Sequence, residues 1–248
     1  MKFTTFKTSL TEILPLRNLF LQENNFQIRY NACHERGWTD SYLFTLDGMS
    51  VGYGSVKGNG NHTDRDTIFE FYLIPSFRNH SLNLFAELLL ASGARYIECQ
   101  SNDGLLTPLL YQFGKNINSD VILFEDHIRT SLGADGVIFR RWKDDDVSFE
   151  HKSEPQGDFV LELDMQIVAT GGFLLHYNKP FADLYMEVKE PFRRRGLGSL
   201  IIQEIKKECY LAGRVPAARC NIGNLGSKNT LLKAGLRVAG FMLLGNVK

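Results

Sequence analysis

The sequence of 248 residues predicts an α/β fold in two domains of one architecture. Three observations carry this prediction. Strand-like runs that stop at Pro, Gly or Asp-Gly alternate with helical runs of apolar residues. One order of elements occurs twice: hairpin, strand ending near Pro, helix, strand, short helix, Gly, strand. An apolar fraction of 44% and a charged fraction of 23% are typical of domains that bury a core.

The first half opens with a helical run of leucine and isoleucine that Pro15 is expected to break. Asp47-Gly48 predicts a hairpin, because both residues tolerate positive φ. The next strand stops at Pro75, and the helix after it stops at Gly93. The predicted elements are a broken helix over 8–24, hairpin strands over 42–46 and 50–56, a strand over 67–74, a helix over 82–92, a strand over 95–99, a short helix over 105–113 and a strand over 121–128.

The second half repeats this order beyond Gly133. Asp164-Met165 joins a hairpin, the next strand stops near Pro191, and the following helix stops at Gly213. The predicted elements are a strand over 137–141, hairpin strands over 159–163 and 167–175, a strand over 182–188, a helix over 198–211, a strand over 217–222, a helix over 225–233 and a strand over 238–244. With the join near 130–136, the predicted domains are residues 1–132 and 133–248.

Composition excludes several classes of function. Twenty-eight basic and 28 acidic side chains cancel, so no global field attracts nucleic acid or an anionic membrane. The first 20 residues lack a signal-peptide pattern, and no segment approaches the roughly 20 apolar residues of a membrane span. A cytoplasmic location is therefore the expectation. Cysteines without a CxxC pair and histidines without an HxxxH pair predict reduced thiols and no metal site.

The segment EPFRRRGLGSLII, residues 190–202, joins a strand to a helix and carries most of the functional signal. A helix start leaves N–H groups free, and their partial positive charge suits a pyrophosphate. Gly196 and Gly198 leave room for phosphate oxygens, and the arginines at 193–195 add charge. A dinucleotide GxGxxG would need glycine at Ile201. A plain basic helix start on a solvated loop stays open as the alternative.

The run RRRGLG at 193–198 resembles the R/Q-x-x-G-x-G/A signature of the GNAT superfamily of acyl-CoA-dependent N-acyltransferases. The strand before it contains the valine usual there, Val188, and Asn224 stands eleven residues before Gly235, as in the closing segment of that fold. The resemblance covers roughly 135–248 and, through the repeat, 8–130 more weakly. It implies two GNAT-like domains, each a mixed, mostly antiparallel sheet flanked by helices.

The resemblance further implies that acetyl-CoA is the co-substrate. Backbone amides of the loop would hold its pyrophosphate, and pantetheine would pair with the backbone of the preceding strand. Acyl transfer would proceed by direct attack in a ternary complex. The residues implied in binding are Met186, Val188, Arg193, Arg194, Arg195, Gly196, Leu197, Gly198, Ser199 and Asn224.

The two halves depart from the signature in complementary ways. Ser81 and Asn83 stand where the second half has glycines, so the first domain is not expected to cradle a pyrophosphate. Its expected roles are structural support and a wall of the acceptor site. In the second half, a segment of only about 17 residues, rich in Asp and Glu, replaces the two helices that the family normally has between its first strand and its hairpin. The first domain is expected to fill that gap.

Catalytic candidates lie on the strand ADLYMEVKE, where alternation puts Asp183, Tyr185 and Glu187 on one face. Family members often place a base on this strand, so Glu187 and Asp183 are the candidate bases. Leu231 replaces the usual acid, a tyrosine, and Tyr185 is the candidate substitute. For each carboxylate, an ordinary exposed or interface position stays open as the alternative.

The leading function is transfer of an acetyl group from acetyl-CoA to a primary amine of a small molecule, with a protein amine less favoured. The first rival is a non-catalytic acyl-CoA sensor or scaffold, which Leu231 supports. The second is an interaction protein in which RRRGLG is only a basic helix start. No nucleic-acid or membrane partner is expected, and nothing in the sequence indicates an oligomer.

Overall fold

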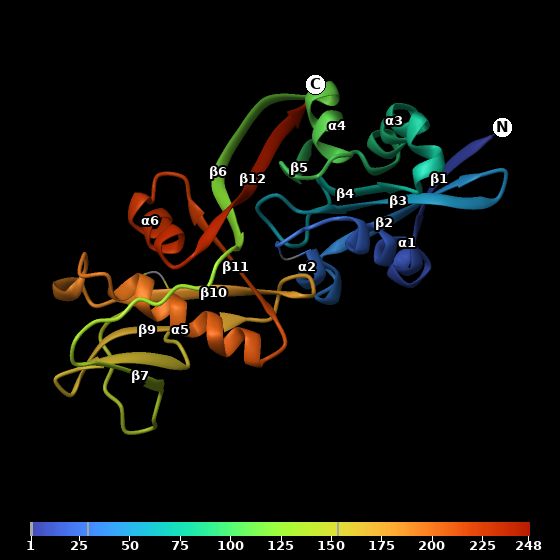
Figure 1. Ribbon diagram of the computed structural model, residues 1–248. Helices are drawn as coiled ribbons and strands as arrows, with labels where there is room; N and C mark the ends of the chain where they lie inside the picture. The colour runs from blue at the N-terminus through green and yellow to red at the C-terminus, as the bar shows by residue number, and fades with distance from the viewer. Residues whose placement is uncertain (1, 29, 153) are drawn as a thin grey trace. The chain divides into compact units, whose positions relative to one another are not determined.

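The computed structural model describes residues 2–28, 30–152 and 154–248, and it shows a mixed α/β structure whose strands are flanked by helices (Figure 1). The chain divides into two compact units. The first unit comprises Met1–Asp120 and Gly240–Lys248, and the second comprises Val121–Ala239. This confirms the predicted fold class. Within the described ranges, no helix is both long and apolar enough to cross a membrane.

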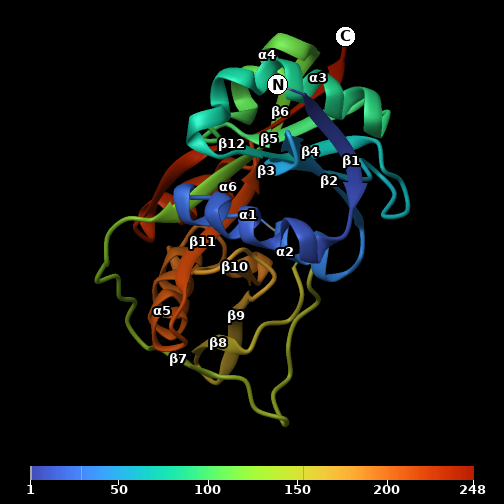
Figure 2. The same cartoon turned by 90° about the vertical axis from the view of Figure 1, so that its right-hand side faces the viewer.

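The first unit has the strand order β1-β2-β3-β4-β5-β12, in which β4 and β5 run parallel. Helices α3 and α4 cover one face of this sheet, and α1 and α2 cover the other (Figure 2). Its elements are β1 (Phe3–Thr8), α1 (Leu10–Glu23), α2 (Tyr30–Glu35), β2 (Thr39–Leu46), β3 (Met49–Lys57), β4 (Thr67–Leu73), the 3-10 helix η1 (Pro75–His80), α3 (Ser81–Ser92), β5 (Tyr96–Gln100), α4 (Leu106–Phe113) and β12 (Leu236–Val247).

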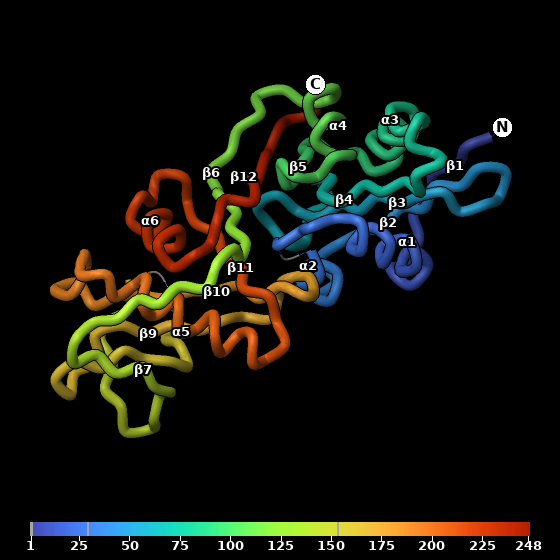
Figure 3. The backbone as a smooth tube through the Cα atoms, viewed as in Figure 1, coloured from blue at the N-terminus to red at the C-terminus, as the bar shows by residue number. Residues whose placement is uncertain are grey.

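The second unit has the strand order β6-β11-β10-β9-β8-β7, and α5 packs across its central strands. The segment between β6 and β7 runs alongside α5 (Figure 3). Its elements are β6 (Gly114–Asp126), which begins in the first unit, β7 (Val137–Arg141), β8 (Phe159–Leu163), β9 (Gln166–Leu174), β10 (Phe181–Val188), the 3-10 helix η2 (Glu190–Phe192), α5 (Leu197–Leu211), β11 (Val215–Asn221) and α6 (Leu225–Lys233).

The units differ from the predicted limits of 1–132 and 133–248. Strand β12 pairs antiparallel with β5, so Gly240–Lys248 belongs to the first unit. The end of β6 pairs with β11, so the second unit begins at Val121. Strand pairing sets both boundaries, and the pairing partners are distant in sequence.

Most predicted elements lie within two residues of their observed bounds, because local turn chemistry marks their ends. Asp47 and Gly48 have φ of 48° and 86°, as a tight hairpin requires. Gly93 ends α3 with φ of 65°, and its N–H donates to the Leu89 carbonyl. Strand β1 and helix α2 were not predicted from the sequence.

The predicted break at Pro15 was wrong. Helix α1 is continuous from Leu10 to Glu23. Ser9 caps its start, since the Ser9 hydroxyl accepts a hydrogen bond from the Glu12 N–H. Ile13 and Phe20 on the buried face lie fully in the core, so tertiary packing outweighs the hydrogen bond that proline removes.

The β8–β9 turn allows a test of the explanation that left-handed turn positions favour glycine. Met165 has a strained, left-handed backbone with φ of 60°. Its side chain is almost fully exposed, so no packing contact compensates for this strain. Met165→Gly should raise the urea midpoint. The expected gain in the free energy of unfolding is about 0.5 kcal/mol, because relief of the strain exceeds the added entropy of glycine in the unfolded chain. Met49→Gly, at an exposed strand position, should lower the midpoint. A lower midpoint for both variants would contradict the account.

Candidate active site

Strand β10 has a free edge near its end. Its parallel pairing with β11 covers three residue pairs, from Phe181 with Val215 to Asp183 with Ala217. The other edge of β10 stays paired with β9 as far as Val188. Beyond Asp183, the backbone of β10 on the β11 side is therefore available to a ligand, as expected for an acyl-CoA site.

The loop after β10 has an anion-binding conformation. Arg194 and Gly196 have left-handed φ angles of 62° and 84°. Left-handed residues alternating with ordinary ones turn successive N–H groups toward one concave side. Helix α5 begins directly afterwards at Leu197, and no side chain caps its start. The loop amides and the first helical N–H groups are thus free for a negatively charged group.

A cavity of about 670 Å³ adjoins this loop and the free end of β10. Nine of the ten predicted binding residues line it, and α6 contributes the opposite wall. Arg195 is the exception, because its guanidinium lies over the Phe192 ring at 5.2 Å. The lining residues are Glu154, Met186, Glu187, Val188, Phe192, Arg193, Arg194, Gly196, Leu197, Gly198, Ser199, Asn224, Gly226, Ser227, Asn229, Thr230 and Lys233.

The two glycines of the loop serve different purposes. Gly196 supplies the positive φ, and a Cβ there would lie 3.6 Å from the Lys233 ammonium. Gly198 allows α5 to approach α6 closely, since a Cβ there would lie 3.2 Å from side-chain carbons of Met186 and Thr230. Lys233 is a cation at this loop that sequence reasoning missed. The sequence did place Lys233 at the end of the predicted helix over 225–233, and this position could have indicated a cation at the loop.

Two predicted binding side chains have structural contacts of their own. Arg193 Nε donates to the Val188 carbonyl at 3.0 Å, which fixes the turn. Asn224 caps α6, since its side-chain oxygen accepts from the Ser227 N–H at 3.0 Å. These residues shape the cavity wall, which leaves Arg194 and Lys233 as the cations with freer side chains.

The corresponding turn of the first unit lacks the anion-binding conformation. Arg78 Nε donates to the Leu73 carbonyl at 3.1 Å, matching Arg193 of the second unit. Here, however, η1 runs directly into α3, and His80 at the junction has φ of −96°. No described residue of this turn is left-handed. This geometry supports the expectation that the first unit does not cradle a pyrophosphate.

The structure separates the three catalytic candidates. Glu187 lines the cavity and is 6% exposed. Asp183 is buried and contacts His176 Nε2 at 3.1 Å. Tyr185 is half-buried, and burial raises the pKa of its hydroxyl. Neither Asp183 nor Tyr185 lines the cavity. Leu231, at the usual acid position, is buried in the core of the second unit.

Glu154 is a titratable residue of the cavity that sequence reasoning missed. Glu154 is exposed overall, but partial burial of its carboxyl raises the pKa, the charge of Asp183 raises it further, and Arg219 lowers it. Glu154 lies in the irregular segment between β7 and β8, within which the described residues form no helix. An isolated glutamate in a charged loop carries no sequence signal that separates it from solvated neighbours. The shortness of that segment was the available clue.

This fold and site define an acyltransferase-like domain with an anion-binding loop at a helix start. Residues 125–235 match the Acetyltransferase (GNAT) family. The second unit therefore resembles a GNAT domain, and the chain as a whole shares the fold of solved GNAT structures, one of them a tandem GNAT protein. No curated protein matches the sequence significantly.

Solved structures share the fold of the whole chain at low sequence identity. A GNAT-family acetyltransferase from Colwellia psychrerythraea is 14% identical with a TM-score of 0.75, and the match covers 100% of both chains. A tandem GNAT protein from the clavulanic acid biosynthesis pathway is 11% identical with a TM-score of 0.60, covering 99% of this chain and 98% of that one. A GCN5-related N-acetyltransferase from Sphaerobacter thermophilus is 14% identical with a TM-score of 0.58, covering 98% and 95%.

Proposed function

We propose that the second unit binds acetyl-CoA and transfers its acetyl group to a primary amine of a small molecule by direct attack in a ternary complex. The observation that carries the proposal is the pair of left-handed residues, Arg194 and Gly196, at the uncapped start of α5. They lie on the cavity that also contains the free edge of β10. The family match over residues 125–235 supports acetyl-CoA as the co-substrate.

The residues present fit the co-substrate. The amides of residues 194–199 would hold the pyrophosphate, with the Lys233 ammonium beside them. The backbone of Met186 and Val188 would pair with pantetheine, because β10 lacks a neighbouring strand there. The bound thioester supplies an activated acetyl group, and the protein's own residues orient the acceptor and remove its proton.

The overall charge of the chain does not select an acceptor. The chain carries 28 basic and 28 acidic side chains, so no net field favours nucleic acid, a membrane or a charged protein tail. We propose a primary amine because the cavity wall carries carboxylates, Glu154 and Glu187, that attract a cationic ammonium.

A non-catalytic acyl-CoA sensor is the second candidate. Leu231 at the usual acid position is 4% exposed and packs in the core, so no acid of that kind reaches the cavity. Release of the thiol from acetyl-CoA in the presence of a panel of primary amines separates the candidates. A sensor would bind acetyl-CoA and release no thiol with any amine.

Calorimetric titration with acetyl-CoA tests the binding site. Gly196→Ser with Gly198→Asn introduces the side chains of the first unit, which strain the left-handed backbone and crowd Thr230. We expect micromolar binding by the parent protein and at least about tenfold weaker binding by this double variant, equivalent to about 1.4 kcal/mol.

The matched control places glycines at the equivalent turn of the first unit, Ser81→Gly with Asn83→Gly. Since that turn is outside the second unit's cavity lining, the control should bind acetyl-CoA as the parent does. Equal binding by the parent and the Gly196/Gly198 variant would refute the assigned site. Absence of binding by the parent would refute the proposed function as a whole.

A further inference from the structure

We propose that Glu154 is the base that takes a proton from the acceptor ammonium, and that Glu187 is a positioning residue that holds the Glu154 segment in place. This inference rests on the proposed acetyl transfer and assigns its proton acceptor. Both carboxylates line the same cavity, and they differ in what already surrounds them.

The Glu187 carboxylate is engaged by donors. The Lys152 N–H lies 3.0 and 3.1 Å from its two oxygens, and the Glu154 N–H lies 3.2 Å from Oε2. Arg193 contacts Oε1 at 3.4 Å. An ionised carboxylate has about four acceptor positions. Because these donors occupy most of them, Glu187 could accept a proton only by giving up contacts that hold the fold together.

The Glu154 carboxylate is available. Among the described residues, none donates a hydrogen bond to its oxygens, although its own N–H is held by Glu187. Lys152, two residues away, directs its ammonium to Glu190 at 2.8 Å. The side chain of Glu154 therefore lines the cavity as a carboxylate with no hydrogen bond to its oxygens and no close ion pair among the described residues.

The surroundings of Glu154 raise the pKa of its carboxyl above the ordinary glutamate value. Burial, the strongest influence, raises the pKa of Glu154, Asp183 and Glu187 raise it further, and Arg219 opposes them. Asp183 contacts His176, and Glu187 contacts Arg193, so each neighbouring carboxylate has a cationic or titratable partner. A base is most effective when its pKa lies near the working pH, which favours Glu154 over an ordinary glutamate.

The segment that carries Glu154 is fixed to the sheet. Two of its N–H groups, from Lys152 and Glu154, donate to one carboxylate on β10. His151 contacts the buried Thr170 hydroxyl of β9 at 2.6 Å. A Cβ at Gly157 would overlap the Gly171 backbone, so the segment also packs closely there. A base held this way keeps its position relative to β10, as catalysis requires.

The proton transfers balance as follows. Glu154 accepts one proton from the ammonium, and the freed nitrogen lone pair forms a C–N bond with the thioester carbonyl carbon. The C–S bond breaks and its electron pair goes to sulfur, which takes the second proton of the nitrogen. Glu154 then releases its proton to water. The products are an amide, the free thiol and one proton, so no further co-reactant is needed.

The test compares Glu154→Gln with Glu187→Gln in thiol release from acetyl-CoA. The probes are the best primary alkylamine of a panel and hydroxylamine, which is largely unprotonated at neutral pH and needs little help from a base. For Glu154→Gln we expect kcat/KM with the alkylamine to fall about 100-fold or more. Hydroxylamine should rescue most of that loss. The acid limb of the alkylamine pH profile should disappear.

For Glu187→Gln we expect a fall with both probes and an acid limb that persists, because the base remains but its segment is less well held. Arg219→Met should move that limb to higher pH. The reason is that Arg219 lowers the pKa of Glu154, and a base with a higher pKa becomes protonated, and inactive, at a higher pH. The ¹³C shift of the Glu154 carboxyl should titrate over the same pH range.

Three outcomes would overturn the assignment. One is full alkylamine activity in Glu154→Gln, and another is loss of the acid limb in Glu187→Gln alone. The third is a parent protein that binds acetyl-CoA yet transfers to neither probe, which removes catalysis and its base together. Failure of the parent to bind acetyl-CoA would instead locate the error in the proposed function, so the binding titration distinguishes the two failures.

Discussion

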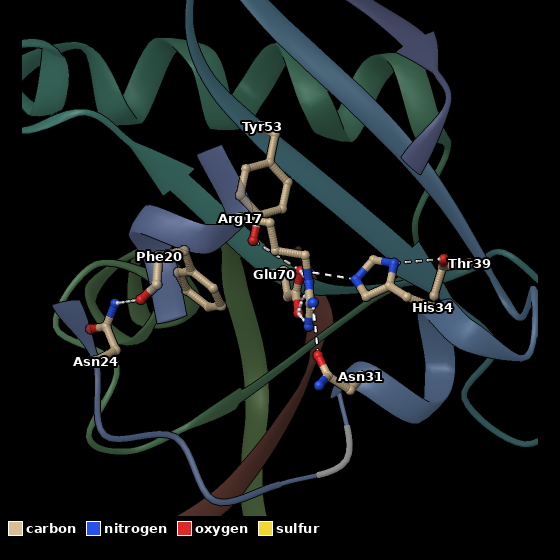
Figure 4. Close-up of polar contacts among 8 residues, drawn as sticks. All are labelled: Arg17, Phe20, Asn24, Asn31, His34, Thr39, Tyr53 and Glu70. Atoms are coloured by element: carbon tan, nitrogen blue, oxygen red, sulfur yellow. Dashed lines mark hydrogen bonds and ion pairs between the residues drawn. The ribbon is translucent and has the colours of Figure 1, made fainter. Parts of the chain in front are cut away.

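Arg17→Met is expected to lower the free energy of unfolding of the first unit by about 3–5 kcal/mol. Arg17 on α1 is 5% exposed, and its guanidinium contacts both oxygens of Glu70 on β4 at 3.1 to 3.2 Å. Glu70 is fully buried and also contacts His34 and the Tyr53 hydroxyl, each at 3.0 Å (Figure 4). Methionine fills similar space but leaves a buried carboxylate with too few partners.

The charge state of Glu70 explains the size of this effect. Burial raises the pKa of its carboxyl, but the Arg17 and His34 charges oppose burial and lower it to about 2. Since the folded value lies below the unfolded one, this ion cluster stabilises the fold above the ordinary glutamate pKa. That stabilisation is lost as pH falls through about 2. Without Arg17, the loss should begin at a higher pH.

Hydrogen exchange of β4 amides measures the opening of the first unit directly. Arg17→Met combined with Glu70→Gln should recover part of the loss, because no buried charge then remains unpaired. Arg95→Met is the matched control. Arg95 also pairs with a carboxylate, Asp66 at 2.9 Å, but its side chain is 69% exposed, so the cost should stay below about 1 kcal/mol. An equal loss in the free energy of unfolding for Arg17→Met and Arg95→Met would show that the buried ion cluster stabilises the fold no more than an exposed ion pair does.

The elements of the fold could be predicted where the signal is local. Gly93, Gly213 and the Asp-Gly hairpin all adopt the left-handed backbone that their residue types favour. The boundary between the units could not be predicted this way. Alternating apolar residues in 236–247 indicate a strand, but they do not say that it pairs with β5. Pairing partners far apart in sequence are chosen by the whole fold.

In the candidate site, too, local features could be predicted and contacts between distant residues could not. The glycines of RRRGLG predicted a loop whose backbone approaches a ligand, and Gly196 has the required φ of 84°. The role of Arg193 could not be seen, because its bond to the Val188 carbonyl exists only once the turn is folded. Glu154 was equally hidden, since the charged groups that shift the pKa of its carboxyl lie on other strands. Backbone requirements leave a sequence signature, whereas the environment of one carboxylate does not.

Lys206→Met should destabilise the second unit by about 3–5 kcal/mol. The sequence alone does not indicate that Lys206 is more important for stability than Lys207, the next residue on α5. The Lys206 ammonium is almost fully buried. It contacts Asp126 Oδ1 at 2.7 Å and donates to the carbonyls of Ile128 at 2.7 Å and Ala234 at 3.1 Å. Two of its N–H groups therefore have carbonyl acceptors and its charge faces Asp126, so methionine would leave two carbonyls without a donor and the carboxylate without its ion-pair partner.

Lys207→Met is the matched control on the same helix. Lys207 is 56% exposed and bonds to Glu204, three residues earlier, so its loss should cost less than about 1 kcal/mol. Hydrogen exchange of α5 and urea unfolding together measure both variants. The ammonium of Lys206 joins α5 to the chain on either side of it, at Ile128 and Ala234, so its removal should loosen both segments at once. If hydrogen exchange becomes faster only within α5, the Lys206 ammonium does not hold the segments at Ile128 and Ala234 against the helix.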